Sequence, residues 1–150
     1  MDYRHYAEAD LPGVLELCAM EGWPSLPEDP GRAHRALTAP GVTTVVATED
    51  GAPVGFAQLL SDGQIQAYLA LISVHPEHRR KGVARKLIVT ALRLAGGLRV
   101  DLLTDTADGF YRSLPHLRMS GYRLYPEYSG PDRYDPGVSW DRGRKVPNPG

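Results

Sequence analysis

The order of hydrophobic and polar residues predicts a strand-rich first half of the chain. Three segments, 43–48, 54–60 and 65–74, are rich in β-branched and other apolar residues, which is typical of half-buried strands. Glu-Asp-Gly at 49–51 and Ser-Asp-Gly at 61–63 separate these segments, and such triplets favour hairpin turns. The pattern therefore predicts three consecutive antiparallel strands.

The segment after these strands has the longer hydrophobic period of a helix. Apolar residues recur at the spacing of one helix face, at Val83, Ala84, Leu87, Ile88, Ala91, Leu92 and Ala95. Gly96-Gly97 predicts the end of this helix, because glycine readily adopts the left-handed conformation of a C-terminal cap. Residues 98–103 then predict a strand. The short connections imply that it runs parallel to 65–74, in a right-handed β-α-β unit.

Weaker patterns mark the two ends of the chain. Asp10 is a candidate N-cap, and Pro12 suits the first turn of a helix. Further expected elements are a strand at 2–6, a helix at 31–38, a short helix at 107–114, and strands at 122–125 and 138–140. Together they predict an α/β (α+β) fold, a mixed and twisted sheet of six or seven strands with helices on both faces. We expect one domain at 1–141 and a flexible tail at 142–150.

Composition and charge narrow the classes of function. The chain has 150 residues and a formal net charge of −1, whereas nucleic-acid-binding domains usually carry a basic surplus. We therefore expect no nucleic-acid partner. No apolar run approaches the roughly 20 residues that span a bilayer, and the first residues lack the apolar core of a signal peptide. These features predict a cytoplasmic protein with no membrane partner.

Cysteine usage excludes two kinds of stabilising site. Cys18 is the only cysteine of the chain, so neither an internal disulfide nor a cysteine-rich zinc site can form. We expect no bound metal.

The most informative segment is Arg-Arg-Lys-Gly at 79–82, between the strand 65–74 and the helix that begins near Val83. The first N–H groups of a helix have no partner within it and carry partial positive charge, so they can bind phosphate oxygens. Gly82 lets the backbone approach a ligand closely, and the three cations raise the local concentration of anions. The segment predicts a phosphate-binding loop. The alternative is a solvated basic turn.

This strand, loop, helix and second strand resemble the GCN5-related N-acetyltransferases, the GNAT family. The family signature is Gln/Arg-x-x-Gly-x-Gly/Ala, and Arg-Arg-Lys-Gly-Val-Ala at 79–84 fits each defined position. Many members also carry Ala-x-x-Phe-Tyr further along, which Ala-Asp-Gly-Phe-Tyr at 107–111 reproduces. The order of expected elements agrees as well, so the resemblance covers about residues 1–141.

Two departures from the family pattern concern the site. Members usually place Gly-Phe about four residues after the tyrosine, whereas here Gly121-Tyr122 follows Tyr111 after ten residues. Residues 112–120 are therefore interpreted as an enlarged loop on the acceptor side. Many members also place an asparagine, which contacts the pantetheine arm, seven residues before the tyrosine. Thr104 stands there, and its hydroxyl can both donate and accept a hydrogen bond.

The resemblance implies that acetyl-CoA is the bound anion and the co-substrate. Its pyrophosphate would accept hydrogen bonds from the N–H groups of about residues 80–85, and its pantetheine amides would pair with the end of the strand 65–74. The N–H of Val74 would polarise the thioester carbonyl as negative charge develops on its oxygen. The implied cofactor-binding residues are Ile72, Ser73, Val74, Arg79, Arg80, Lys81, Gly82, Val83, Ala84, Arg85 and Thr104.

Tyr111 is the residue that the resemblance assigns to the chemistry. After an amine attacks the thioester, CoA leaves as a thiolate that a phenol can protonate. A phenol of pKa near 10 protonates a sulfur of pKa about 8.5 against a gradient of roughly 2 kcal/mol. A local hydrogen bond or a lowered tyrosine pKa would offset that gradient. The alternative role of Tyr111 is packing on a short helix.

The acceptor side stays open. The candidates for the base that deprotonates the amine are His75, His78, His116, Glu21 and Asp62, and none is assigned because members often use a chain of waters. Trp23 and Tyr68 can line an apolar amine pocket or belong to the core. No extended acidic groove for a basic peptide is evident, which favours a small-molecule acceptor. Dimers are common in the family, so a homodimer is a further expectation.

The leading hypothesis is an N-acetyltransferase that moves the acetyl group of acetyl-CoA directly to a primary amine in a ternary complex. Cys18 lies on the apolar face of the first predicted helix, which argues against an acyl-cysteine intermediate. The alternatives are a catalytically silent acyl-CoA-binding module and an acetyltransferase that acts on a protein or peptide. A nucleotide-binding domain is disfavoured because Gly-x-x-x-x-Gly-Lys-Ser/Thr is absent.

Overall fold

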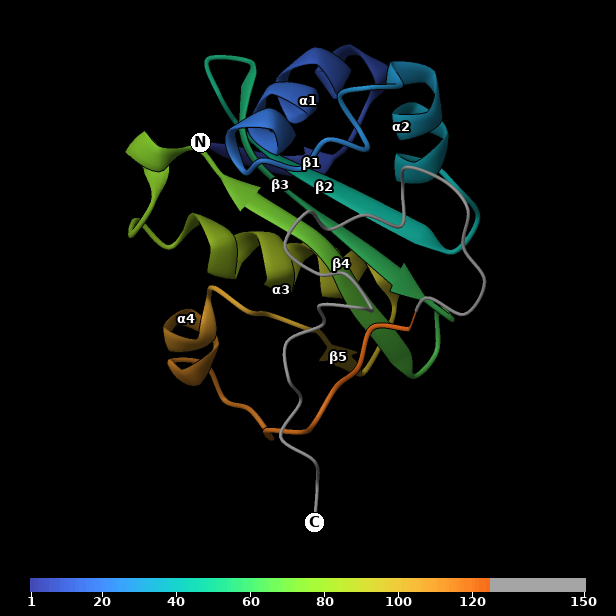
Figure 1. Ribbon diagram of the computed structural model, residues 1–150, viewed down its shortest axis with the longest axis vertical. Helices are drawn as coiled ribbons and strands as arrows, with labels where there is room; N and C mark the ends of the chain where they lie inside the picture. Colours follow the sequence, from blue (N-terminus) through green and yellow to red (C-terminus); the bar gives the residue numbers. More distant parts are fainter. Residues whose placement is uncertain (125–150) are drawn as a thin grey trace, which may run out of the picture. The chain divides into compact units, whose positions relative to one another are not determined.

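The order of helices and strands agrees with the order that the sequence predicts (Figure 1). The computed structural model describes residues 1–124. Residues 1–117 form one compact unit, and residues 118–124, which belong to a second, contain no helix or strand. The elements are β1 (Asp2–His5), the 3₁₀-helix η1 (Glu8–Asp10), α1 (Leu11–Met20), α2 (Pro30–Leu37), β2 (Val42–Glu49), β3 (Ala52–Ser61), β4 (Gln66–Val74), the 3₁₀-helix η2 (Pro76–His78), α3 (Val83–Ala95), β5 (Arg99–Asp101) and α4 (Asp108–Arg112).

The strands form one mixed sheet in the order β1-β2-β3-β4-β5. The first four strands are antiparallel neighbours, and β5 pairs with β4 in parallel. This confirms the predicted meander of three strands and the β-α-β unit, in which α3 connects β4 to β5. Parallel neighbours need such a crossover because a tight turn can only reverse the chain.

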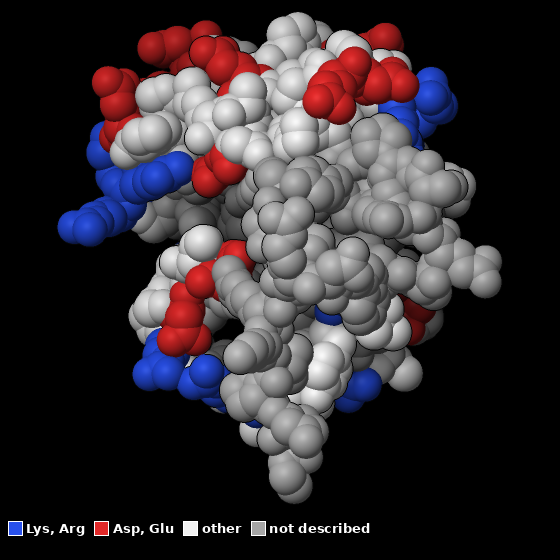
Figure 2. Space-filling model, viewed as in Figure 1, with Lys and Arg blue, Asp and Glu red and all other residues white. Residues whose placement is uncertain are grey.

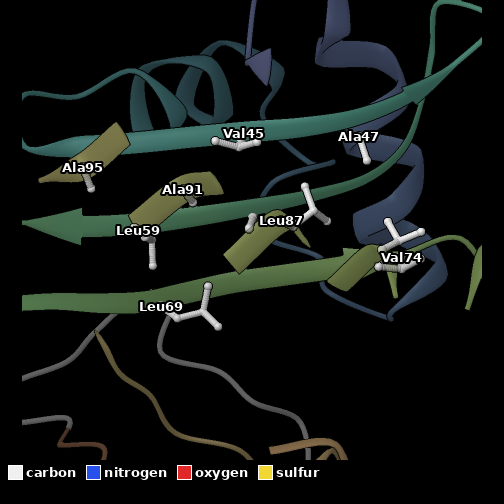
Figure 3. Packing of buried hydrophobic residues seen from close by; sticks show 10 residues of the cluster. Val45, Ala47, Leu59, Leu69, Val74, Leu87, Ala91 and Ala95 are labelled. Carbon is white, nitrogen blue, oxygen red and sulfur yellow. The ribbon is translucent and has the colours of Figure 1, made fainter. Parts of the chain in front are cut away.

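Helices cover both faces of the sheet, as predicted. On one face, α3 packs Val83, Leu87, Ala91 and Ala95 onto strand residues such as Val45, Leu59 and Leu69 (Figure 3). On the other face, Val14, Leu17 and Cys18 of α1 and Leu37 of α2 pack against Val46 and Phe56. Successive strand residues point to opposite faces, so Val45 and Val46 enter different cores. This two-sided burial explains why the middle strands are apolar almost throughout.

A β-bulge interrupts β4 just before the residues of the predicted site. Gln58 of β3 pairs with Leu71, whereas the next residue, Leu59, pairs with Leu69, so Ala70 is an extra residue in β4. Because of this insertion, Leu69 and Val74 lie on the same face of the sheet although they are five residues apart. A bulge also bends its strand and increases the local twist.

Asp10 is the N-cap residue of the first helix, as the sequence predicts, but its side chain makes no capping bond. Asp10 ends η1, and its side chain caps no N–H of α1. Its buried carboxylate instead accepts two hydrogen bonds from the guanidinium of Arg4, at 2.7 and 2.8 Å, and one from the N–H of Ala7. These bonds hold the pKa of Asp10 below its usual value. The second helix does have a side-chain cap, since Asp29 accepts from the N–H of Arg32 at 2.9 Å.

The number of strands differs from the prediction. Within residues 1–124 the sheet has five strands, where six or seven were expected. The predicted strand at 122–125 is not formed at 122–124. Residue 125, the strand at 138–140, the domain boundary at 141 and the tail at 142–150 lie outside the described residues. No helix within residues 1–124 combines the length and the apolar character needed to cross a membrane.

Candidate active site

The end of β4 has an open edge. β5 pairs only with Gln66, Ala67 and Tyr68, at the start of β4, whereas β3 accompanies β4 to Val74. Among residues 1–124, β4 therefore has a strand neighbour on one side alone beyond Tyr68. An edge of this kind can pair with an extended ligand through its backbone groups.

The hydrogen-bonding pattern identifies the backbone groups that face this edge. The N–H of His75 donates to the carbonyl of Val54 at 2.8 Å, and hydrogen-bonded pairs alternate along an antiparallel ladder. Ser73 is therefore the next residue that bonds to β3, while Ile72 and Val74 direct their N–H and C=O groups to the open side. Of the three predicted strand contacts, Ile72 and Val74 offer backbone groups to a ligand, and Ser73 uses its own within the sheet.

The loop between β4 and α3 presents an uninterrupted series of N–H groups. Two of its residues have a positive φ, Arg80 at 60° and Gly82 at 79°. Within residues 1–124, the N–H groups of residues 80–85 donate to no backbone or side-chain acceptor, and the first N–H that does so is that of Lys86, to Gly82. These six groups include those of Val83, Ala84 and Arg85 in the first turn of α3. They provide the donors that an anion needs.

The predicted cofactor-binding residues of this loop and of the start of α3 differ in how far they are buried. Val83 is buried and Ala84 half-buried against the core below α3. Arg80, Lys81 and Arg85 are exposed and form no ion pair with any residue of the described part of the chain. Figure 2 shows long basic side chains at the edge of the molecule where Figure 1 draws this loop. From residue 78 to residue 100 the sequence contains no Asp or Glu, so the positive charge here is not locally neutralised.

Arg79 differs from the other three cations because its side chain is bound within the protein. Its Nε donates to the carbonyl of Val74 at 2.9 Å, and its Nη2 donates to Oε1 of Glu21 at the same distance. The same carboxylate oxygen accepts from Oγ of Ser73 at 2.9 Å. The resemblance implies that Ser73 contacts the cofactor through its backbone and that the side chain of Arg79 acts mainly as long-range charge. In the structure, the side chains of both residues join β4 to the C-terminal end of α1.

The histidines at the start of the loop have local partners. Nδ1 of His75 accepts from the N–H of Glu77 at 3.3 Å, and the rings of His75 and His78 meet edge to face. His78 Nε2 lies 3.5 Å from a carboxylate oxygen of Glu49, and its buried Nδ1 has no partner among the described residues. These contacts are those of turn residues, as the sequence suggests for this pair. His116 is exposed, with Nδ1 2.8 Å from the carbonyl of Leu114.

Tyr111 lies on α4, a single turn that follows β5. Its ring packs against the core cluster that includes Val74 and Val83, and it meets Phe110 edge to face at 4.9 Å. Burial raises the pKa of Tyr111 above its usual value, which is opposite to the shift that would ease transfer of its proton to sulfur. Its hydroxyl forms no hydrogen bond within residues 1–124. The proton is therefore held at neutral pH, and the hydroxyl is free to donate to a ligand.

Thr104 has a structural partner. Its Oγ1 accepts from the N–H of Ala107 at 3.0 Å, just before α4 begins. The sequence predicts a helix at 107–114, whereas α4 begins at Asp108, ends at Arg112 and has no side-chain cap. Thr104 is exposed and can still donate through its hydroxyl hydrogen.

Two shallow hollows flank the sheet. One, of about 370 Å³, is lined by residues that include Trp23, Pro24, Pro27 and Glu28, in the segment between α1 and α2. Trp23 also packs against the core beside α1, which confirms its predicted core role, whereas its role in an amine pocket stays a prediction. The other, of about 390 Å³, lies at the start of β4 and includes Tyr68 and Leu60.

Glu21 is the residue of this region that sequence reasoning placed only among several candidate bases. Glu21 and Arg79 are 58 positions apart in the sequence, and no local sequence pattern predicts that such distant residues form a pair. The position of Glu21 directly after the last residue of α1 gives no indication of this contact.

Comparisons with known proteins agree with this geometry. A family model described as an acetyltransferase (GNAT) domain matches residues 40–114. The chain is similar to mycothiol acetyltransferases from two Streptomyces species: it is 36% identical to that of S. bingchenggensis over 125 residues, and 33% identical to that of S. avermitilis over 122 residues. Each match covers 81% of this chain but only 39% or 38% of the relative. The chain therefore spans about two fifths of the length of these curated relatives.

Solved structures give the same fold. A protein from Agrobacterium tumefaciens that is assigned as an acetyltransferase is 26% identical, with a TM-score of 0.68, over 83% of this chain and 99% of that one. An aminoglycoside N-acetyltransferase solved with CoA has a TM-score of 0.68 at 19% identity, over 85% and 100% of the two chains; this likeness concerns the fold alone. The chain belongs to the acetyltransferase (GNAT) family.

Proposed function

We propose that this chain is an N-acetyltransferase that moves the acetyl group of acetyl-CoA to the primary amine of a small molecule, by direct attack within a ternary complex. The observation that carries the proposal is the coincidence of two sets of unpaired backbone groups. One set faces the open edge at Ile72 and Val74, and the other is the series of N–H groups at residues 80–85. An extended arm that ends in a diphosphate suits both sets at once.

The proposed roles of the loop follow from its charge and its backbone. The N–H groups of residues 80–85 hold the pyrophosphate, as donors at a helix start do for anions. The exposed side chains of Arg80, Lys81 and Arg85 attract the anion over a longer range. Gly82 provides the left-handed turn, and a Cβ there would project into space that no atom of the protein occupies within 4 Å, which is the space left for the ligand.

The proposed chemistry uses Val74 and Tyr111. The N–H of Val74 stabilises the negative charge that develops on the thioester oxygen when the amine nitrogen attacks. The amine nitrogen releases a proton to water as the new carbon–nitrogen bond forms and the carbon–sulfur bond breaks. Tyr111 supplies the proton that converts the departing thiolate to a thiol, and it regains a proton from solvent. Because burial raises the pKa of Tyr111, this proton moves against a larger gradient than between free groups. A hydrogen bond from the hydroxyl to the sulfur, formed before transfer, is the remaining way to lower the barrier.

The acceptor side of the site is acidic, which supports an amine acceptor. Six acidic residues and no Lys or Arg occur from residue 8 to residue 29: Glu8, Asp10, Glu16, Glu21, Glu28 and Asp29. Asp10 is paired with Arg4 and Glu21 with Arg79, so the other four account for the acidic character of this surface. Figure 2 shows acidic side chains around the part of the molecule where Figure 1 draws α1, and basic ones as well towards α2, which contains Arg32 and Arg35. A protonated primary amine is attracted to such a surface before it reaches the site.

The names of the relatives and neighbours support a small-molecule acceptor without identifying one. The curated relatives are named mycothiol acetyltransferases. Solved neighbours of under 25% identity include both aminoglycoside acetyltransferases and a ribosomal-protein-alanine N-acetyltransferase. Since the same fold serves both kinds of acceptor, a protein or peptide acceptor is the alternative that the acceptor screen must include.

The experiment that tests the proposal measures acetyl-CoA binding by calorimetry and release of CoA thiol with a panel of primary amines. Cys18 does not disturb a thiol assay, because it is buried and burial raises its pKa to about 12. Binding together with amine-dependent thiol release supports the enzyme. Binding without release on small amines or peptides favours a silent acyl-CoA-binding module, and absence of binding refutes both.

Three further sequence-based predictions belong to this proposal. The chain acts as a single domain over residues 1–141, it resides in the cytoplasm, and it forms a homodimer. Light scattering after size-exclusion chromatography measures the oligomeric state directly. Fractionation of cells that express the natural protein measures its location.

A further inference from the structure

Glu21 joins three elements at the candidate site and has no role in the chemistry described above. It follows α1 as its C-terminal cap residue. Its Oε1 accepts from Ser73 of β4 and from Arg79 of the loop, both at 2.9 Å. The carboxylate is largely sheltered, with 28% of its side chain exposed. A charge-assisted hydrogen bond in such a place is stronger than one in open solvent.

Arg79 links Glu21 to the end of β4. Its Nε bonds to the carbonyl of Val74 while its Nη2 bonds to Glu21. A guanidinium is planar and its donors point in fixed directions, so the bond at Nη2 determines where Nε lies. The side chain of Arg79 is 51% exposed, and without the carboxylate it would be free to turn into solvent.

The hydrogen bond from Arg79 to the carbonyl of Val74 determines which backbone group of Val74 is left for a ligand at the open edge. With its C=O occupied by Arg79, Val74 presents its N–H as the remaining backbone group there. A donor next to a guanidinium is a favourable place for developing negative charge. Ser73, between Ile72 and Val74, is held from the other side of the strand by the same oxygen of Glu21.

We propose that Glu21 is a positioning residue for acetyl-CoA. It acts through Arg79 and Ser73 to hold the last residues of β4, and the start of the phosphate-binding loop, in the arrangement that receives the cofactor. The inference rests on the proposed function but assigns Glu21 neither proton transfer nor recognition of the amine. Glu21 acts by accepting hydrogen bonds, which a neutral oxygen atom at the same position can also accept.

The test compares two substitutions of Glu21 that separate hydrogen bonding from charge. Gln has nearly the same shape and keeps an oxygen that can accept from Ser73 and Arg79, whereas Ala removes both bonds. The readout is the Kd of acetyl-CoA by calorimetry, together with kcat and the KM for the amine. Glu16→Ala is the matched control, because Glu16 is an exposed carboxylate on the same helix. Thermal unfolding of each variant confirms that it is folded.

We expect Glu21→Ala to weaken acetyl-CoA binding about tenfold, the effect of losing one hydrogen bond to a charged group. Glu21→Gln should stay within about threefold of the wild type, as should Glu16→Ala. Arg79→Ala should weaken binding as Glu21→Ala does, and the double variant should be little worse than either, because the two side chains act as one unit. Arg79→Ala also tests the inference if Glu21→Ala does not fold.

Three results would overturn the inference. Unchanged acetyl-CoA affinity in both Glu21→Ala and Arg79→Ala would show that the contacts are irrelevant to the cofactor. A Gln variant as impaired as the Ala variant would show that charge matters rather than position. A rise in the amine KM alone would make Glu21 an acceptor-binding residue. All three require a wild-type protein that binds acetyl-CoA, so they are distinguishable from failure of the proposed function.

Discussion

The two ends of β4 differ in how completely the fold uses their backbone groups. Ala67 and Tyr68 lie between β3 and β5 and pair with both strands, and Gln66 pairs with Arg99 of β5. Side chains reinforce this closed end, since Gln66 donates to Asp101 at 2.7 Å and accepts from Arg99 at 2.6 Å. The residues after the bulge at Ala70 pair with β3 alone.

At the open end, side-chain contacts replace the missing strand only in part. Arg79 takes the carbonyl of Val74, and Glu21 holds Ser73, but the N–H groups of Ile72 and Val74 keep their free side. A buried polar group without a partner costs about 1–3 kcal/mol, so an edge that water or a ligand can reach is the tolerable place for such groups. The comparison shows that the sheet can bind a ligand at the edge where the backbone groups of β4 have no strand partner among the described residues.

The largest expected effect comes from Tyr111, whose hydroxyl the fold leaves without a partner in the described residues. Tyr111→Phe should lower kcat by about 10²- to 10⁴-fold, the usual contribution of a general acid, with little change in acetyl-CoA affinity. The acid acts in its protonated form and burial raises its pKa, so wild-type kcat should decline on the alkaline side only above pH 10, the usual pKa of a phenol.

The matched control for Tyr111 is Tyr6, whose hydroxyl lies 3.0 Å from Nδ1 of His34. Tyr6→Phe should reduce the free energy of unfolding by about 0.5–1.5 kcal/mol through loss of this hydrogen bond and leave kcat unchanged. Equal kcat values for Tyr111→Phe and the wild type would remove Tyr111 from the mechanism.

The next effect concerns the packing that holds α3 against both ends of β4. Leu87 is fully buried, and Leu87→Ala should lower the free energy of unfolding by about 2–5 kcal/mol, as expected for a cavity in a core. Urea denaturation measures it. Val89, on the same helix, is 61% exposed, and Val89→Ala should change stability by less than about 0.5 kcal/mol. Similar losses for the two variants would contradict the packing described for this face.

Gly82 and Gly51 form a pair that separates backbone strain from ligand binding. Both have a positive φ, 79° and 84°, and a Cβ at either position would meet no atom within 4 Å. Substitution by Ala should cost each variant about 1–2 kcal/mol of stability through the left-handed conformation. Only Gly82→Ala should also weaken acetyl-CoA binding, because only its methyl group projects where the ligand approaches. Calorimetry measures the affinity of each variant for acetyl-CoA. Equal affinities of the Gly82→Ala and Gly51→Ala variants would argue against a cofactor at this loop.

The smallest effect is expected at the closed end of β4. Gln66→Ala removes the side-chain bonds to Arg99 and Asp101 and should reduce the free energy of unfolding by about 1 kcal/mol. Acetyl-CoA affinity should stay at the wild-type value, since this end faces no ligand in the proposed complex. A marked loss of affinity would mean that the two ends of β4 are not independent.

Local patterns account for the parts of the fold that were predicted well. The helix at 83–95 agrees with its prediction at both ends, because its apolar spacing, the glycine before it and the two glycines after it all act within a few residues. The hairpins of β2, β3 and β4 follow from turn triplets next to apolar segments. Asp10 is the N-cap residue of α1, as predicted, but its side chain makes no capping bond because it pairs with Arg4 on a different element.

The sequence by itself determined the family, the mixed sheet with helices on both faces, and the loop whose N–H groups open α3. These depend on residue types at short spacing, which the chain carries wherever its elements are placed. Only the tertiary structure decided that β5 stops after three residues, that Ala70 is inserted in β4, and that Glu21 meets Arg79. Each of these depends on which distant segments pack together, and hence on contacts that no local pattern encodes.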